Sequence, residues 1–436
     1  MRPASQPDLA TRHRDVMPPW SPLYHRDDPL EIASGQGCWV RDGHDRSYLD
    51  FYSGIAANIL GYDVPEVRAA VERQLRTGIV HTSTFYLIRS QVELAERVAR
   101  VSGIADPVVF FTCSGTEAVE TALLLATEYR RSHQVVALRH GYHGRSFGAL
   151  AVTGDNRWKG MGLSPVNVAH IPAGRPEGST SADLDGPAYV RLCAEELEHL
   201  VDTELPQPVA ALLAEPVQGV AGAVPLESGQ LAAYAEILRE RGILLIVDEV
   251  QTGWGRTGRY WGYQWENVRP DLLVFAKGVG NGLALGGVVG RREVMSCLTM
   301  PSISTFGGNP LATTAAVATL DAIEDRDLPA HAHRVGDLLR ERLDRQLCDL
   351  SSVLRVQGQG LLLGLAFVRP GTHAPSPERA VAVQEECRSN GLLVGTGGRA
   401  GNRLRIMPPL TVTAEEALHG ADVIAAAARR TDTHWR

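Results

Sequence analysis

Two apolar stretches that end in charged residues decide the fold of this chain. Residues 242–249 read Gly-Ile-Leu-Leu-Ile-Val-Asp-Glu, and residues 272–277 read Leu-Leu-Val-Phe-Ala-Lys. Both are as short and as apolar as strands that are buried on both faces of a parallel sheet. Similar strands are expected at 107–111, 135–138 and 210–214, with helices at 116–131, 191–200 and 231–241. This alternation predicts an α/β protein in which helices cover both faces of a parallel sheet.

The segments on either side of the alternation predict a second, smaller domain. Before it, residues 37–51 read as a hairpin with its turn at Asp42-Gly43, and residues 1–20 form a polar, Pro-rich arm that we expect to be mobile. After it, two helices and a strand are expected between 312 and 367. We therefore expect three segments: an arm and hairpin over 1–62 that contribute to the small domain, a large domain over 63–311, and a small α+β domain over 312–436.

The composition excludes several classes of protein. The chain has 436 residues, 44% hydrophobic and 21% charged, which is ordinary for a soluble globular protein. A net charge of −7 argues against a nucleic-acid partner, and no apolar run approaches the length of a membrane span. The six cysteines are scattered without CxxC spacing, which favours reduced thiols and predicts neither a disulfide frame nor a metal site. We expect a cytoplasmic protein.

Lysine is scarce in this chain, and the position of one lysine is informative. Of the 43 basic residues only Lys159 and Lys277 are lysine, and the rest are arginine. Because arginine does not lose its proton in proteins, a retained lysine is a candidate for chemistry that needs a primary amine. Lys159 lies in a polar stretch, where a solvated charge is the simpler interpretation. Lys277 closes a buried strand, where desolvation makes the amine nucleophilic; a salt-bridging lysine is the alternative.

Two further groups are expected beside Lys277. Asp248 ends the preceding strand, and the carboxyl ends of parallel strands meet at one edge of a sheet, where ligands bind. Ser114 and Glu117 have the spacing of a capping box, so a helix is predicted to begin there with free N–H groups that suit a phosphate. Pyridoxal phosphate needs such a phosphate site, a carboxylate for its ring nitrogen and an amine for its aldehyde.

The chain resembles the class III (ω-type) aminotransferases of fold type I from about Gly35 to Pro409. The resemblance is carried, in order, by Ser-Gly-Thr-Glu-Ala at 114–118, Tyr-His-Gly-Arg at 142–145, Glu-Pro-Val-Gln-Gly at 215–219, Asp-Glu-Val-Gln-Thr-Gly at 248–253, Gly-Arg-Thr-Gly at 255–258, Ala-Lys-Gly at 276–278, Thr-Phe-Gly-Gly-Asn-Pro at 305–310 and Arg-Ile-Met-Pro-Pro at 405–409. It implies a large domain with a mainly parallel seven-stranded sheet, and a smaller α+β domain.

The resemblance also implies a role for each matching residue. Lys277 would bind the cofactor aldehyde and move a proton, and Asp248 would pair with the ring nitrogen. Thr305 would reach the phosphate in the neighbouring subunit, which implies a homodimer. The other residues implied to bind the cofactor are Ser114, Gly115, Thr116, Tyr142, His143, Glu215, Val250 and Gln251. Val250 could instead be a core residue.

Departures from the family pattern concern the substrate. Arg145 and Arg405 are candidates for binding a carboxylate, because a guanidinium matches it with two hydrogen bonds. In ornithine-type members a glutamate follows Gln-Gly and holds the second arginine aside, whereas this chain has Val220. Ile55 replaces a polar aromatic residue of those members, and Phe85 lies in a segment similar to the alanine–glyoxylate branch. The chain thus resembles the alanine–glyoxylate/pyruvate branch more than the ornithine branch.

These observations predict a ping-pong aminotransferase that moves an amino group from an amino acid or amine to an oxo acid. The same lysine and aspartate would also serve an epimerase, racemase or decarboxylase on this scaffold. A non-enzymatic regulator that senses pyridoxal phosphate is a third class. Such regulators carry an additional DNA-binding domain, for which the short N-terminal arm leaves no room.

Overall fold

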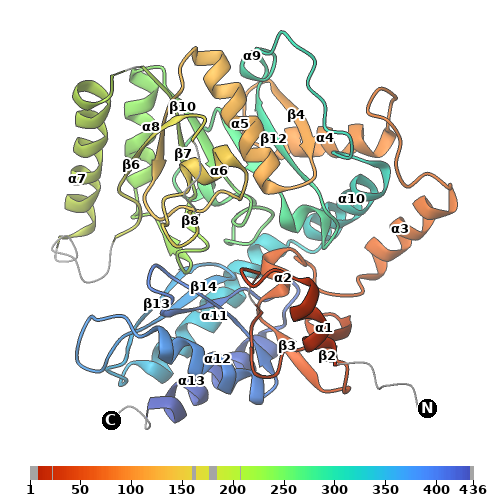
Figure 1. Ribbon diagram of the computed structural model, residues 1–436, viewed down its shortest axis with the longest axis vertical. Helices are drawn as coiled ribbons and strands as arrows, with labels where there is room; N and C mark the ends of the chain where they lie inside the picture. The colour runs from red at the N-terminus through yellow and green to blue at the C-terminus, as the bar shows by residue number, and fades with distance from the viewer. Residues whose placement is uncertain (1–7, 22, 160–163, 176–183, 207, 433–436) are drawn as a thin grey trace.

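The computed structural model describes residues 8–21, 23–159, 164–175, 184–206 and 208–432. The upper half of the molecule in Figure 1 is built on a seven-stranded sheet, in the order β4-β12-β11-β10-β7-β5-β6. Its strands are β4 (Pro107–Thr112), β5 (Gln134–Leu138), β6 (Asn167–Ile171), β7 (Val209–Ala214), β10 (Leu244–Asp248), β11 (Leu272–Phe275) and β12 (Gly286–Arg291). Only β12 runs antiparallel to its neighbours, so the predicted mainly parallel sheet is confirmed.

Helices cover both faces of this sheet because alternate strand residues point to opposite sides. In β10, Leu245 and Val247 pack into one apolar cluster with α8, whereas Leu244 and Ile246 pack into another with α5. Each such side chain contributes roughly 1.5–3 kcal/mol when buried. The helices of this half are α3 (Pro65–Arg76), α4 (Arg89–Val101), α5 (Gly115–Arg130), α6 (Phe147–Val152), α7 (Gly186–His199), α8 (Gln230–Glu240) and α9 (Arg292–Met295), and a short hairpin joins β8 (Val217–Gln218) to β9 (Val224–Pro225).

The lower half combines segments from both ends of the chain. One four-stranded sheet joins β1 (Ile32–Gln36), β2 (Trp39–Asp42) and β3 (Ser47–Asp50) to β15 (Leu392–Leu393), which runs parallel to β3. A second contains β13 (Val353–Gln359), β14 (Leu362–Phe367), β17 (Arg403–Ile406) and β16 (Gly395–Gly397). The helices of this half are α11 (Leu328–Leu347), α12 (Pro377–Ser389) and α13 (Ala414–Asp432), whereas α10 (Pro310–Asp325) packs against α3 and α4 in the upper half. This half is the smaller α+β domain; the three residue boundaries given above remain a prediction.

The segment predicted as a mobile arm contains a helix, α1 (Leu9–Val16). The Asp8 carboxylate accepts a hydrogen bond from the Thr11 N–H at 2.9 Å, which caps the helix start. Residues 1–7 of that segment lie outside the described residues. Asp8 is therefore the sequence signal for this helix. The polar, Pro-rich composition of the segment did not indicate it.

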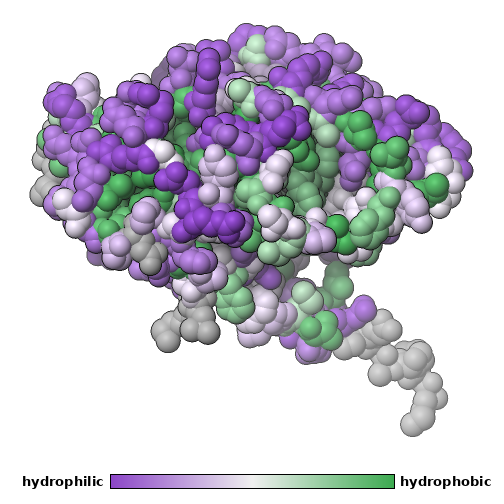
Figure 2. All heavy atoms as spheres, turned by 90° about the horizontal axis from the view of Figure 1, so that it is seen from above, coloured by the Kyte–Doolittle hydropathy of each residue, from purple (hydrophilic) through white to green (hydrophobic). Residues whose placement is uncertain are grey.

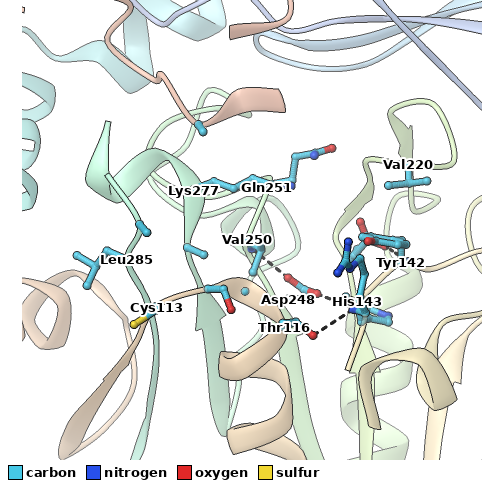
Figure 3. Close-up of a pocket in the computed structure, with 18 of the residues that line it drawn as sticks. Cys113, Thr116, Tyr142, His143, Val220, Asp248, Val250, Gln251, Lys277 and Leu285 are labelled. Atoms are coloured by element: carbon cyan, nitrogen blue, oxygen red, sulfur yellow. Dashed lines mark hydrogen bonds and ion pairs between the residues drawn. The ribbon is translucent and has the colours of Figure 1, made fainter. Parts of the chain in front are cut away.

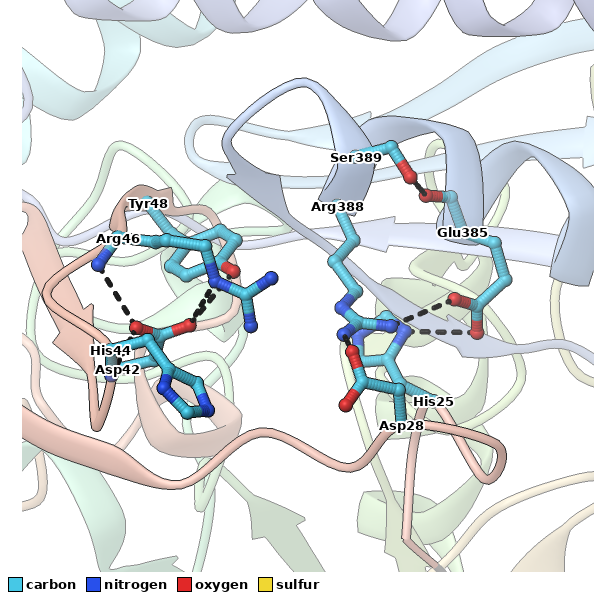
Figure 4. A network of polar contacts seen from close by, with 9 residues as sticks. All are labelled: His25, Asp28, Asp42, His44, Arg46, Tyr48, Glu385, Arg388 and Ser389. Atoms are coloured by element: carbon cyan, nitrogen blue, oxygen red, sulfur yellow. Dashed lines mark hydrogen bonds and ion pairs between the residues drawn. The ribbon is translucent and has the colours of Figure 1, made fainter.

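The residues after α1 are fastened to α12 by a polar network (Figure 4). The His25 Nδ1 atom lies 2.9 Å from Glu385 Oε1, and Arg388 is paired with Asp28. His25 is buried, and burial lowers its pKa. These contacts hold the backbone on both sides of residues 26 and 27, and they fix the position of the neighbouring Tyr24.

Figure 2 shows the surface of one face of the molecule. Seen from above, hydrophilic side chains cover much of the face in Figure 2, with hydrophobic side chains between them. No helix in the described part of the chain is long and apolar enough to cross a bilayer.

Candidate active site

Asp248 and Lys277 lie at the same edge of the large sheet. Strands β10 and β11 are parallel neighbours, with Asp248 paired to Val274, three residues before Lys277. Lys277 begins a short 3₁₀ turn, η4 (Lys277–Gly280), with a φ of 48°, in the left-handed region that L residues adopt at a cost of about 1–2 kcal/mol. The turn leads the chain away from the strand beside a cavity of about 400 Å³ (Figure 3).

This cavity brings together most of the residues predicted for the site. Those that line it are Ser114, Gly115, Thr116, Tyr142, His143, Arg145, Glu215, Asp248, Val250, Gln251 and Lys277, together with Val220. The sequence analysis missed other lining residues, namely Ala57, Cys113, Gly144, Ala276 and the run Gly282-Leu283-Ala284-Leu285. That run has no charged residue and leads into β12, the antiparallel strand of the large sheet. Nothing in its side chains therefore indicated a place in the site.

Lys277 is half-buried at the wall of the cavity. Desolvation is the main cause that lowers its pKa to about 8, and the positive charge of Arg405 acts in the same direction; Asp248 and Glu215 oppose them. With a pKa near 8, roughly one molecule in ten carries an uncharged, nucleophilic amine at pH 7. The lowered pKa has the direction expected for an amine at the end of a buried strand.

The carboxylate of Asp248 is buried, with 4% of the residue exposed, and lies between Val250 and His143 in Figure 3. Its Oδ1 atom accepts a hydrogen bond from the Val250 N–H at 3.0 Å, and its Oδ2 atom lies 2.7 Å from His143 Nδ1. Burial acts to lower the pKa of His143, but the bond to Asp248 outweighs it, and the pKa is raised. His143 therefore orients the carboxylate at the mouth of β10.

Glu215 forms hydrogen bonds to the backbone in the walls of the cavity. Its Oε1 atom accepts a hydrogen bond from the Tyr142 N–H at 2.9 Å, and its Oε2 atom accepts one from the Gly219 N–H at 3.0 Å. Burial raises the pKa of this carboxyl. Glu215 thus braces the backbone that carries Tyr142 on one side and Val220 on the other. Tyr142 also packs edge-on against Trp158, with ring centroids 5.4 Å apart.

The helix predicted at this point begins with Ser114 as the cap of α5, but the capping box is incomplete. The Glu117 N–H donates to Ser114 Oγ at 3.4 Å, whereas Glu117 Oε2 accepts a hydrogen bond from the N–H of Cys113, the residue before the cap, at 2.7 Å. A Cβ added to Gly115 would lie 3.0 Å from Val250 Cγ1, so a larger residue there would press on Val250. The Thr116 hydroxyl accepts hydrogen bonds from the N–H groups of residues 145 and 146, both at 3.1 Å. The free N–H groups of this helix start favour an anion.

Arg405 lies outside the residues that line the cavity and reaches the site through Gln251. Its Nη2 atom donates to Gln251 Oε1 at 2.9 Å, and its Nη1 atom donates to the Tyr52 hydroxyl at 3.0 Å. The residue is 4% exposed, and its partners within the described residues are uncharged, with no carboxylate among them. A buried guanidinium without an acidic partner is costly and indicates an anionic ligand.

The remaining predicted residues lie elsewhere. Ile55 lines a second cavity, of about 1000 Å³, together with Tyr52 and Trp158. Phe85 is 79% exposed and Thr305 is also exposed, and neither lines the cavity around Lys277. Arg145, by contrast, does line that cavity, and its guanidinium stacks over the ring of Trp20, 5.8 Å from the ring centroid.

Comparisons with known proteins agree with this site. The model of the class-III aminotransferase family matches residues 23–428. Alanine–glyoxylate aminotransferase 2 homolog 2, mitochondrial, of Arabidopsis thaliana is 35% identical, over 95% of this chain and 86% of its own. An alanine/serine racemase of Pyrococcus horikoshii is 33% identical (93% and 87%), and acetylornithine aminotransferase 1 of Bordetella bronchiseptica is 34% identical (89% and 92%). An amine transaminase structure from an uncultivated Pseudomonas species, in the PLP-bound form, superposes with a TM-score of 0.88 at 30% identity (97% and 98%).

The chain therefore belongs to the class-III aminotransferase family. It is an aminotransferase that depends on pyridoxal phosphate, and the residues around the cavity suit that cofactor: the anion-favouring start of α5, the buried Asp248 carboxylate and the amine of Lys277. When bound, the cofactor supplies an aldehyde that condenses with an amine and a ring that withdraws electrons from the substrate.

Proposed function

We propose that this aminotransferase takes its amino group from alanine or a similar neutral amino acid and passes it to pyruvate or glyoxylate, in preference to the glutamate and 2-oxoglutarate pair. The carrying observation is that buried Arg405 has no acidic partner among the described residues, while Val220 occupies the position after Gln-Gly. A glutamate there would give the arginine an alternative partner. Without one, the guanidinium keeps its charge for a substrate carboxylate.

In this proposal the residues of the site divide the work. Lys277 Nζ would bind the cofactor aldehyde and, when free, would move the substrate proton. Asp248 would keep the ring nitrogen protonated, and the N–H groups at the start of α5 would hold the phosphate, with Thr116 beside them. Tyr142 and Val250 would contact the ring, and Gln251 would hydrogen-bond the ring oxygen. Arg405 and Arg145 hold carboxylate, with Ile55 nearby.

The proposed donor preference predicts the outcome of a half-reaction. With the enzyme and a single amino acid, alanine is expected to convert the bound cofactor with a second-order rate constant at least about tenfold above that for glutamate, because no device here moves Arg405 aside for a second carboxylate. The change in visible absorbance of the enzyme measures both rates. A preference for glutamate would contradict the inference from Val220.

A second candidate function is epimerisation or racemisation on the same lysine. The relative from Pyrococcus horikoshii is named an alanine/serine racemase, and this favours keeping the alternative. Incubation with L-alanine and no oxo acid separates the two. A transaminase stops after one turnover per site, whereas a racemase continues until the optical rotation is lost.

We also propose that the enzyme is a homodimer, with Thr305 completing the neighbouring site and Phe85 lining it. Apolar side chains gather in the sequence on both sides of Thr305 and beside Phe85, and they are exposed in the single chain: Tyr86, Leu87, Met300, Ile303 and Phe306. The two segments meet, since the rings of His81 and Phe306 are 4.7 Å apart. Exposed apolar groups of this size are typical of subunit contacts.

The free thiols of all six cysteines support a cytoplasmic location.

The shared site predicts complementation between two impaired variants. Thr305→Val is expected to weaken cofactor binding about tenfold, because one hydrogen bond to phosphate is lost. When Thr305→Val is mixed with inactive Lys277→Ala and the subunits exchange, each heterodimer gains one site with both an intact Lys277 and a partner threonine. Activity should therefore rise above the sum of the separate samples at limiting cofactor. No gain, with subunit exchange verified by mass, would contradict the shared site.

A further inference from the structure

The guanidinium of Arg405 is held by neutral groups. Besides Gln251, its partner is Tyr52, which accepts a hydrogen bond from Nη1 at 3.0 Å and places its ring 5.5 Å below the guanidinium carbon. Burial raises the pKa of the Tyr52 hydroxyl above its ordinary value near 10, so the phenol is uncharged at neutral pH. A neutral partner orients the guanidinium and leaves its net charge unopposed.

Tyr52 is itself fixed by an unusual turn. The four residues that follow it, α2 (Ser53–Ala56), all have positive φ: 42° for Ser53, 60° for Gly54, 63° for Ile55 and 62° for Ala56. A left-handed turn costs about 1–2 kcal/mol for each residue with a Cβ, so the surrounding structure must enforce it. The Asp50 carboxylate does so, because its Oδ1 atom accepts the N–H groups of Tyr52 at 2.8 Å and Ser53 at 3.1 Å.

The turn is also joined to the strand that carries Arg405. The Ser53 hydroxyl donates to the carbonyl oxygen of Met407 at 2.6 Å, and the Met407 N–H donates to the carbonyl oxygen of Phe51 at 2.7 Å. Met407 lies two residues after Arg405 and directly follows β17. The tyrosine and the arginine are thus held on one hydrogen-bonded frame, although 353 residues separate them.

A second tyrosine supports the first from the N-terminal segment. The Tyr24 hydroxyl donates to the Tyr52 hydroxyl at 3.2 Å and accepts a hydrogen bond from the Thr396 N–H at 3.2 Å. The adjacent His25 is bound to Glu385 in the network of Figure 4, so the backbone at Tyr24 is held in place.

We propose that Tyr52 is the positioning residue for Arg405: a fixed, neutral phenol that orients the guanidinium and keeps it ready for a substrate carboxylate in both halves of the reaction. Tyr24 secures the phenol. This inference rests on the proposed function, in which Arg405 holds that carboxylate. It follows that Arg405 need not move aside to admit alternate substrates.

Tyr52→Phe in the holoenzyme tests the proposal, because it keeps the ring and removes only the oxygen. The KM for alanine and the inhibition constant of propionate, a carboxylate without an amine, are each expected to rise about tenfold, while kcat changes less than about twofold. Tyr48→Phe is the matched control, since its buried hydroxyl bonds Asp42 at 3.1 Å in the N-terminal sheet. It should leave both constants unchanged.

The outcomes separate this inference from the proposed function. If Arg405→Met leaves propionate inhibition unchanged, the arginine does not hold the carboxylate and the proposed function fails. If Arg405→Met weakens propionate but Tyr52→Phe does not, only the role of Tyr52 is overturned. A fall in kcat with unchanged KM, or an equal effect of Tyr48→Phe, would also overturn it.

Discussion

Lys277→Ala is expected to abolish turnover, lowering kcat by at least roughly 10⁵-fold, because one amine both binds the cofactor aldehyde and moves the substrate proton. Among the residues that the structure describes, no other amine lines the cavity. The only other lysine, Lys159, donates to the carbonyl oxygen of Ala151 at 2.9 Å and does not line the cavity around Lys277. The arginines near the site cannot act as bases, since their guanidinium groups keep their protons.

Absorbance and steady-state rates measure the effect of Lys277→Ala. The visible band of the lysine-bound cofactor should disappear, and added methylamine should restore a small part of the rate by supplying a free amine. Lys159→Ala is the matched control and should retain both the band and full activity. An unchanged band with full turnover in Lys277→Ala would remove the assignment of the site.

Asp248→Asn is expected to lower kcat by roughly 10³-fold, with a smaller change in KM, because a neutral amide cannot keep the ring nitrogen protonated. The substitution also removes the charge that raises the pKa of His143, so this histidine should lose its proton at a lower pH than in the parent. Single-turnover rates with alanine measure the first effect, and the imidazole NMR signal measures the second.

The neighbouring carboxyl provides a control for Asp248→Asn. Glu249 accepts hydrogen bonds from Thr252 Oγ1 and from the N–H groups of Gly262 and Tyr263, away from the cavity. Burial raises its pKa to about 7, so neutral Gln is close to the form that the site tolerates. Glu249→Gln should keep kcat within about threefold and lower the Tm by a few degrees. Comparable losses of kcat in Asp248→Asn and Glu249→Gln would contradict the proposed role of Asp248 at the ring nitrogen.

Much of the large sheet could be predicted, because its central strands are short and apolar. The strands that were not predicted, β6 and β12, lack that signature. Strand β12 contains Gly286, Gly287 and Gly290, residues that weaken any strand prediction. Packing explains one of them, since a Cβ at Gly287 would lie 2.5 Å from the ring of Phe275. Only the folded neighbour reveals that requirement.

The candidate site was predictable where its residues follow strands, as Asp248 and Lys277 do. The partners of Arg405 were not, because Tyr52 meets it through a left-handed turn that no local pattern indicates. Glu215 was expected to bind the cofactor. In the structure its carboxylate accepts hydrogen bonds from two backbone N–H groups in the walls of the cavity. Thr305 and Phe85 face outward in the single chain, so their roles stay predictions that depend on a second subunit.

The parallel pairing of β3 with β15 has a consequence for synthesis on the ribosome. Leu49 is paired with Leu392, so the hairpin that emerges early waits for almost the whole chain before its sheet is complete. Until then Leu49 and Phe51, both fully buried in the finished protein, are uncovered. Long delays of this kind slow folding and leave strand edges open to aggregation. Recovery of folded enzyme should therefore depend on chaperones that hold the nascent N-terminal segment.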